Sequence, residues 1–524
     1  MSEEVAPKGW CVATIMDVAA SSGGGTPSKS DPSYWDEGTI PWVSPKDMKS
    51  FLVTSSEDSV TTKALARLTL IPSESVLVVV RSGILSRTLP VSINKIPVTV
   101  NQDMRAFVPA GGIDARYIAW QLVSKERDIL DRCAKDGTTV ASIEGPALAT
   151  YPMAIAPLNE QTRIVEKLEE LLSDLDAGVA ELKAAQRKLA QYRQSLLKAA
   201  VEGALTADWR AARAQSGEPQ ETGAALLQRI LTERRTRWES KQLAKFAEQG
   251  KTPPKDWKAK YSEPIALDTT NLPALPEGWV WTSLDALVAE SSYGTSVKCG
   301  YESDETPVLR IPNVSAGKLN LHDMKCSIQT LSLDEDDYLS VGDVLVIRTN
   351  GSIGLVGRAA AVTEALPTPH YFASYLLRLR CVDRVFLHRW ISSVLAAHAA
   401  RRWLEARAAS SAGQHNISLS TLLTMPVPLP PKTEQVYALD LLANSMEQCD
   451  EQEEALSRSV NQSVAQRKNI LKAAFAGQLV PQHPNDEPAS ALLERIRAER
   501  DNPEHASTRS RRMKQPKRPL EPDA

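Results

Sequence analysis

Basic, amide and hydroxyl side chains interrupt apolar runs in both halves of the chain, as in loops that contact a polyanion. In the first half these residues are Lys29, Lys46, Arg81, Ser82 and Arg87. In the second half they are Lys298, Arg310, Asn313, Arg348, Thr349, Asn350, Gln414, His415 and Asn416, with Tyr293 in the same group of loops. Arginine can contact guanine through two hydrogen bonds, Asn and Gln can contact adenine, and Ser, Thr and Lys bind phosphates. We therefore treat them as candidate DNA-binding residues, with Arg81, Arg310, Arg348, Asn350 and Asn416 as the better candidates for base contacts. Each one alone also fits an ordinary surface position.

Sequence motifs of catalytic sites are missing. The chain has no Gly-x-Gly-x-x-Gly, no phosphate loop ending in Gly-Lys-Ser/Thr, no Gly-x-Ser-x-Gly and no His-Glu-x-x-His. The Asn-Pro-Pro-aromatic tetrapeptide of amino-methyltransferases is missing too, and the six cysteines form no Cys-x-x-Cys pair. We expect no catalytic site, no metal and no cofactor in this chain, although a carboxylate pair assembled from distant segments stays open.

Length and charge limit how such loops can be presented. A chain of 524 residues exceeds one ordinary hydrophobic core, so two or three domains are expected. The formal net charge of −3 means that nucleic acid would be bound through local basic surfaces. No apolar run reaches the roughly 18 residues of a membrane span and the start lacks signal-peptide features, so we expect a cytoplasmic protein with reduced cysteines and no membrane contact.

The sequence contains an internal repeat. Pro7-Lys8-Gly9-Trp10 returns as Pro276-Glu277-Gly278-Trp279, and the apolar run at 76–79 matches that at 344–347. Residues from Ile143 to Gly203 then reappear 274 positions later, among them Pro152, Glu160, Gln161, Arg193 and Leu197 as Pro426, Glu434, Gln435, Arg467 and Leu471. In each half, one amphipathic tryptophan-bearing helix is predicted before this repeat, over 117–133 and 385–408. The pattern predicts two similar α+β domains related by an internal pseudo-twofold repeat.

The repeated segments predict long helices that begin after a proline and end near Gly203 and Gly477. In the first copy, leucines recur every seven residues at Leu168, Leu175, Leu182, Leu189 and Leu196, and Leu171 and Tyr192 are among those that fill the other seam position. The second copy has a poorer stripe with Leu442, Leu456 and Ile470. Sustained heptads indicate a coiled coil, so we expect the two helices to pair with each other. Packing of each stripe on its own globular half is the alternative.

These signals divide the chain into six parts. A first globular domain is expected over 1–158, a first coiled-coil helix over 159–206 and a helical, charged linker insertion over 207–270. A second globular domain over 271–431 and a second coiled-coil helix over 432–480 follow. Residues 481–524 hold a helical piece, cognate to one near Leu226, and a basic tail from Arg509 to Arg518 that we expect to be disordered.

The combination resembles a known family, the specificity subunits of type I restriction-modification systems. The resemblance covers nearly the whole chain and rests on the Gly-Trp pairs at 9–10 and 278–279 and on the proline-punctuated runs that lead into Glu160-Gln161 and Glu434-Gln435. It implies two target-recognition domains, each reading one half of a split, asymmetric duplex DNA sequence. The two domains would be held apart by two conserved helices that form an antiparallel coiled coil.

The resemblance also implies partners. Two adenine methyltransferase subunits would dock on the helices, and restriction subunits that translocate and cut DNA would join the complex. S-adenosylmethionine, ATP and magnesium would then belong to those subunits, and this chain would not be catalytic. Two other hypotheses stay open: a pseudo-symmetric coiled-coil scaffold for protein interactions without sequence-specific DNA binding, and an enzyme with an unrecognised site.

Overall fold

The computed structural model describes residues 7–135, 140–216, 221–411 and 413–501. Its contacts group the chain into two compact units. Unit 1 contains the described residues up to Lys183 and those from Ser457 onward, and unit 2 runs from Ala184 to Leu456. The basic tail at 509–518 lies outside the described residues.

The described part of unit 1 contains two sheets and two strand pairs. Strands β2 (Ala19–Gly23), β9 (Met104–Pro109), β6 (Ser75–Val79), β7 (Val91–Asn94) and β4 (Leu52–Val53) form a five-stranded sheet in that order. A smaller sheet has the order β5 (Asp58–Val60), β3 (Ile40–Val43) and β8 (Thr99–Val100), in which β3 and β8 run parallel. Strand β1 (Cys11–Thr14) pairs antiparallel with β12 (Pro152–Ile155), so the two ends of this domain meet.

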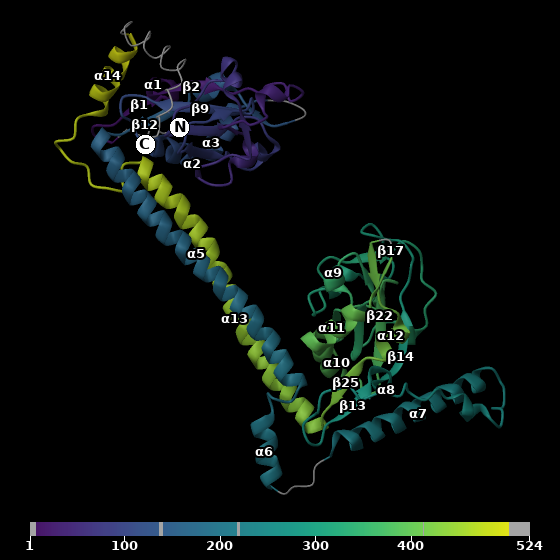
Figure 1. Cartoon of the computed structure of the whole chain (residues 1–524). Coiled ribbons are helices and arrows are strands. Elements are labelled where there is room, and N and C mark those ends of the chain that lie inside the picture. The colour runs from purple at the N-terminus through teal and green to yellow at the C-terminus, as the bar shows by residue number, and fades with distance from the viewer. Residues whose placement is uncertain (1–6, 136–139, 217–220, 412, 502–524) are drawn as a thin grey trace, which may run out of the picture. The chain divides into compact units, whose positions relative to one another are not determined.

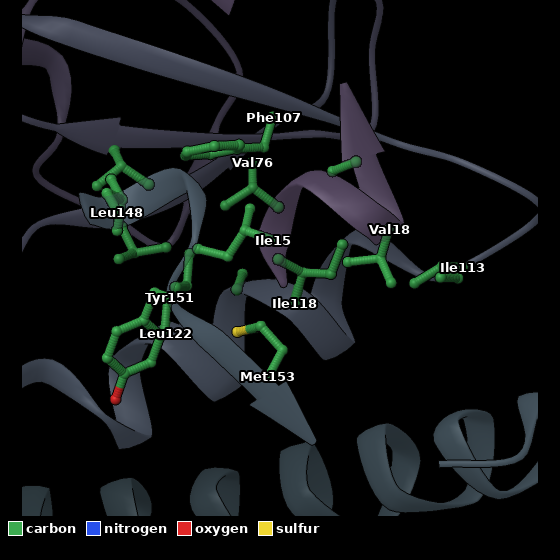
Figure 2. Close-up of a cluster of buried hydrophobic side chains, with 14 of the residues drawn as sticks. Ile15, Val18, Val76, Phe107, Ile113, Ile118, Leu122, Leu148, Tyr151 and Met153 are labelled. Carbon is green, nitrogen blue, oxygen red and sulfur yellow. The ribbon is translucent and has the colours of Figure 1, made fainter. Parts of the chain in front are cut away.

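The core of unit 1 lies between the large sheet and its helices. Figure 2 shows Val76 and Phe107 of the sheet close to Ile15 of the short helix α1 (Ile15–Val18) and to Ile118 of α2 (Ala115–Ser124). Strand β6 is buried along its whole length, as expected of a central strand with a continuous apolar run.

Unit 2 repeats this plan. Its larger sheet has the order β14 (Val288–Tyr293), β22 (Leu376–Cys381), β18 (Asp343–Ile347) and β20 (Ala359–Ala361). The smaller sheet contains β15 (Cys299–Gly300), β17 (Lys325–Ser327), β16 (Pro307–Leu309) and β21 (Tyr371–Phe372), again with one parallel pair, β16 with β21. Strand β13 (Val280–Ser283) pairs with β25 (Pro426–Leu429), and the helix α8 (Leu284–Leu287) corresponds to α1. The expected α+β fold with an internal repeat is confirmed.

The tryptophan-bearing helices differ from the prediction of one helix in each half. In unit 1 the helix breaks at Lys125 into α2 and α3 (Glu126–Cys133), and in unit 2 it breaks at Ala397 into α10 (Leu387–Ala396) and α11 (His398–Arg407). Ala397 adopts an extended backbone, with φ −68° and ψ 146°. An apolar face continues across each break, so hydrophobic periodicity alone did not reveal it.

A close backbone approach requires glycine directly after β2 and directly after β14. A Cβ added to Gly24 would lie 1.9 Å from the carbonyl oxygen of Asn101, and one added to Gly294 would lie 2.2 Å from that of Phe372. The glycine-rich segment at 23–25 therefore includes a residue that lets two backbones pack together.

The helices α5 (Leu158–Val201) and α13 (Lys432–Phe475) run antiparallel in both units (Figure 1). In unit 1 Arg163 pairs with Asp486 just beyond α13, and Asp176 pairs with Arg467. In unit 2 Arg193 of α5 pairs with Asp450 at 2.7 Å and with Glu453 at 2.8 Å. The helices end before Gly203 and Gly477, whose positive φ angles of 77° and 68° close them as the sequence predicted.

The leucine stripe takes part in two kinds of packing. Leu189, Leu196 and Leu442 are buried in one cluster with Cys449, against which Leu456 packs, as in a helix pair. In unit 1 Leu168 joins a cluster that contains Trp10 of the globular part, with Ile470 packed against it, so the helices pack on the domain as well as on each other. Leu175 and Leu182 are half-buried. The sequence placed Leu171 and Tyr192 in the seam between the helices. In the structure Leu172 is buried in place of Leu171, and Tyr192 is 53% exposed.

The helical segments after the two long helices pack into the cores of the globular parts, and we call each of these segments a clasp. In unit 2, α6 (Ala207–Ser216) is followed by α7 (Gly223–Glu248), whose Leu226 and Ile230 enter the core. In unit 1 the corresponding Leu492 and Ile496 of α14 (Ala489–Asp501) enter the core. The backbone N–H of Gly223 donates to the carbonyl of Gly278 at 2.6 Å, and that of Ala489 donates to Gly9 at 2.9 Å. The repeat therefore extends to the helical segments that follow each long helix.

Two further features follow from the described residues. None of their helices is both long enough and apolar enough to cross a bilayer. All six cysteines are free thiols.

Candidate nucleic-acid interface

A small sheet at the end of the buried strand β18 gathers candidate residues that are far apart in the sequence. After β18 the chain passes through Arg348 into β19 (Thr349–Asn350), which pairs with β24 (Gln414–Asn416). Strand β24 also pairs with β23 (Ala409–Ser411), which follows α11. In the register, Thr349 lies opposite Asn416 and Asn350 lies opposite His415. The backbone thus brings Arg348, Thr349, Asn350, Gln414, His415 and Asn416 together. We call this group the unit 2 recognition sheet.

The Arg348 side chain is oriented by one neighbour in this sheet and one in β14. Its guanidinium carbon lies 4.8 Å from the ring centroid of Tyr293, the last residue of β14. Its Nε donates to Oδ1 of Asn416 at 3.3 Å. A planar guanidinium held on an aromatic face keeps its remaining N–H donors in a fixed fork. Because Tyr293 is 45% exposed, this pair lies at the protein surface, where it can meet a ligand.

The neighbouring side chains supply both hydrogen-bond donors and hydrogen-bond acceptors. Asn350 Oδ1 accepts from the backbone N–H of Ser352 at 2.8 Å, which orients the amide. Gln414 is exposed and His415 is half-buried. Arginine, amide and imidazole groups on one short sheet can contact both base edges and phosphates of a duplex.

Three candidates of unit 2 lie outside the recognition sheet. Arg310 is bound to Asp323 by its Nη2, at 2.9 Å to the carbonyl oxygen and 3.1 Å to the carboxylate, and its side chain is only 15% exposed. Asn313 is 1% exposed, and its amide caps the turn at Arg310 and donates to the carbonyls of Asn320 and Asp323. The structure gives these two residues a structural task, whereas Lys298 is exposed.

Unit 1 has a related hairpin at the equivalent position. Strands β10 (Ala134–Lys135) and β11 (Ser142–Ile143) pair after α3, and Arg81 forms an isolated bridge with Ser142. The backbone N–H of Ile143 donates to Val80 at 2.8 Å, just as that of Ile417 donates to Arg348 at 2.8 Å. Arg81 and Ser82 therefore correspond to Thr349 and Asn350. We call Arg81, Ser82 and the hairpin the unit 1 recognition hairpin.

The other unit 1 candidates are spread over the surface. Lys29 is exposed in a turn, and Arg87 is exposed at the end of the 3₁₀ turn that Ser82 caps. Lys46 forms ion pairs with Glu57 and Asp58, and its hydrogen bond to Asp58 is the main cause of a raised pKa. Because Glu57 and Asp58 already pair with it, Lys46 is a poorer phosphate ligand than the sequence alone indicated.

Two features of the interface were missed by sequence reasoning. Tyr293 was noted only as a loop residue, yet it is the stacking partner of Arg348. Arg407 was not selected, although its guanidinium lies 4.3 Å from the ring centroid of Trp403 at the end of α11, directly before β23. Its place at the end of a helix that leads into a polar hairpin was the signal available. No group of three or more metal-ligating side chains occurs within the part of the chain that the structure describes.

Residues 7–184 match the family model for the type I restriction modification DNA specificity domain. Over this range the chain is similar to the specificity subunits of type I restriction-modification systems. The matched range covers β1 to β12 and the first part of α5. Unit 2 repeats this plan outside that range, with four strands in its larger sheet and four in its smaller sheet.

Curated relatives and a solved structure agree. The chain is 40% identical over 189 residues to the EcoR124I/EcoR124II specificity subunit of Escherichia coli, an alignment that covers 35% of this chain and 47% of that protein. It thus spans about half the length of that relative. It is 25% identical over 379 residues to the EcoKI specificity subunit of Escherichia coli strain K12, covering 70% of this chain and 67% of the relative. A structure described as "Structural basis underlying complex assembly and conformational transition of the type I R-M system" matches in fold, with TM-score 0.62, 16% identity and coverage of 90% and 99%.

Proposed function

We propose that this chain is the DNA sequence-specificity subunit of a type I restriction-modification complex, in which each unit reads one half of a split, asymmetric duplex target. The observation that carries the proposal is the duplicated recognition element. In both units the chain after the buried central strand continues into a polar dipeptide. This dipeptide lies beside a hairpin, and the hairpin follows a pair of helices in the sequence. The dipeptide is Arg81-Ser82 in one unit and Thr349-Asn350 in the other. Different side chains at one backbone position favour two different half-sites.

The same proposal assigns the chemistry to other subunits. Two adenine methyltransferase subunits would dock on α5 and α13, and restriction subunits would complete the complex. S-adenosylmethionine, ATP and magnesium would be bound by those partners, and this chain would act by recognition without catalysis, in the cytoplasm. The family name of its relatives supports this division of labour.

Selection from a random duplex library tests the recognition function. The chain, purified with its methyltransferase subunits, should enrich duplexes that carry two short words at a fixed spacing. Affinity for the selected duplex should fall steeply as salt rises, because phosphate contacts release counterions. Recovery of a random pool at every round would contradict the proposal. That result would favour the protein-interaction scaffold.

Activity of the chain alone tests the assignment of chemistry. Neither methyl transfer from S-adenosylmethionine nor cleavage of duplex DNA should occur without the partner subunits. Activity that survives in the isolated chain and is lost on substitution of one acidic residue would make the chain an enzyme.

A further inference from the structure

Unit 2 carries a basic site apart from its recognition sheet. It is formed in part by the turns of α7 that continue beyond the residues packed in the core. The clasp itself uses Leu226 and Ile230, the counterparts of Leu492 and Ile496 in α14. The described part of α14 ends at Asp501, but α7 continues to Glu248. Since the described turns of α14 already complete a clasp, the turns of α7 beyond the corresponding point are available for another task.

Aromatic rings hold the returning chain against these additional turns. Trp238 of α7 stacks on Trp257 with ring centroids 5.8 Å apart and also contacts Tyr261 edge-on at 5.3 Å. The guanidinium carbon of Arg234 lies 5.5 Å from the centroid of Tyr261, and its Nη1 donates to the hydroxyl of that residue at 2.8 Å. The segment around Tyr261 is thereby fixed beside α7 and forms one wall of a cavity.

This cavity is strongly basic. It has a volume of about 240 Å³ and is open to solvent between α7, the 257–262 segment and the sheet strands β14 and β22. Six cationic side chains line it, and Glu290 is the one carboxylate among the lining residues. The cationic side chains are Arg234, Arg237, Lys241, Lys260, Arg380 and Arg384. We call it the α7 cleft.

Structural ion pairs account for only part of this charge. Lys241 pairs with Glu290 at 2.6 Å, Arg380 with buried Asp343 at 2.8 Å, and Arg234 with Asp285 at 3.6 Å. Arg237 pairs with Glu233 on the same helix. For Lys260 and Arg384, no carboxylate of the described chain lies within ion-pair distance, although Arg384 donates to the hydroxyl of Ser340 at 3.4 Å. Two cations of the cleft are therefore available to an external anion.

We infer that the α7 cleft binds phosphate groups, as a phosphodiester of DNA or as the phosphates of a free nucleotide. Arginine and lysine side chains that converge from separate elements suit an anion with several oxygen atoms and more than one negative charge. The cleft reaches β14 at Ala289 and Glu290, whereas Tyr293, on which Arg348 of the unit 2 recognition sheet stacks, ends that strand. The inference therefore adds a site to the proposed function and does not depend on base recognition.

Calorimetric titration of the full chain with inorganic pyrophosphate tests the site directly. The double variant Lys260→Ala/Arg384→Ala should weaken pyrophosphate binding about tenfold or more, because charge-assisted hydrogen bonds are lost. The matched control Lys245→Ala/Lys255→Ala removes two exposed lysines of the same region that do not line the cleft and should leave binding unchanged. Thermal midpoints of all variants establish that they remain folded.

DNA binding separates the two sources of phosphate. With a target duplex that carries long flanks, a DNA source predicts lower affinity for the cleft variant and a salt slope smaller by about 0.9 for each lost contact. A nucleotide source predicts weaker pyrophosphate binding with unchanged DNA affinity. The inference is overturned if the wild type does not bind pyrophosphate or if cleft and control variants behave alike. Base preference, scored on the same duplexes, reports on the proposed function separately, since the cleft variant should retain it.

Discussion

At the residue scale, Arg348 is the side chain whose geometry is best prepared for reading a base. Tyr293 and Asn416 hold its guanidinium, and lysine could replace the charge but neither the planar stack nor the Nε hydrogen bond. Arg348→Lys should therefore reduce discrimination at one base pair of one half-site by about 1–3 kcal/mol while largely preserving binding to unrelated DNA. Titration of duplexes with single base-pair substitutions measures this.

The exposed Lys298 provides the matched control for Arg348. Lys298→Ala should weaken binding to all duplexes equally and change the salt slope by about 0.9 at most. A loss of overall affinity without any change in base preference in Arg348→Lys would show that Arg348 contacts phosphate.

A second residue-scale prediction concerns two buried glutamates at equivalent positions. Trp10 Nε1 donates to Glu160 at 3.1 Å, and Trp279 Nε1 donates to Glu434 at 2.9 Å. Glu434 also pairs with Arg210, whereas burial raises the pKa of Glu160 despite the hydrogen bond from Trp10. Between the unfolded and the raised folded pKa, only the folded chain keeps this proton. Its stabilising contribution is thus fully present below the unfolded pKa and is lost as pH rises through the folded pKa.

Glu160→Gln should remove that pH dependence, because glutamine accepts the tryptophan hydrogen bond without ionising. Apparent urea midpoints of wild type and variant, followed from pH 4 upward, should differ in slope over the acid range and run parallel above it. Glu434→Gln should instead lower the midpoint at neutral pH, since it removes the ion-pair partner of Arg210. Equal slopes in wild type and Glu160→Gln would show that Glu160 does not titrate in this way.

At the element scale, the sequence predicted which helices exist better than where they pack. Heptads and paired glycines located α5 and α13, and the cognate pieces around Leu226 and Leu492 were recognised as helices. Nothing in their local pattern showed that each would enter a core of its unit, because an amphipathic face does not specify its partner. The recognition sheet was hidden for the same reason, since β19 and β24 meet through long-range pairing.

The clasps give an element-scale prediction with an internal control. Leu492 is 2% exposed in the core of unit 1, and Leu226 is 1% exposed in the core of unit 2. Each leucine-to-alanine substitution should destabilise its own unit by about 2–5 kcal/mol. Hydrogen exchange should then quicken in β6 for Leu492→Ala and in β18 for Leu226→Ala. If either variant accelerated exchange equally in both strands, the two units would not be separate folding units.

At the scale of the whole molecule, duplication is what could be predicted most fully from the sequence, and it determines the form of the function. A constant offset of 274 residues located both copies of the helical region, while the loops that carry Arg81 and Arg348 have diverged. Which candidates contact a ligand could not be predicted, because Arg310 and Arg348 look alike in sequence. Only the fold shows that Arg310 pairs with the carboxylate of Asp323, whereas Arg348 stacks on the exposed ring of Tyr293.

Two independent recognition elements predict additive effects on a split target. Arg81→Ala should change base preference in one half-site only, and Arg348→Ala should change it in the other half-site only. Because residues without shared partners contribute independently, the free-energy changes in the double variant should add within about 0.5 kcal/mol. A double-mutant cycle, measured on duplexes altered in either half, provides this comparison. Non-additive effects, or a change of preference in both half-sites from one substitution, would mean that the two units read the DNA as a single surface.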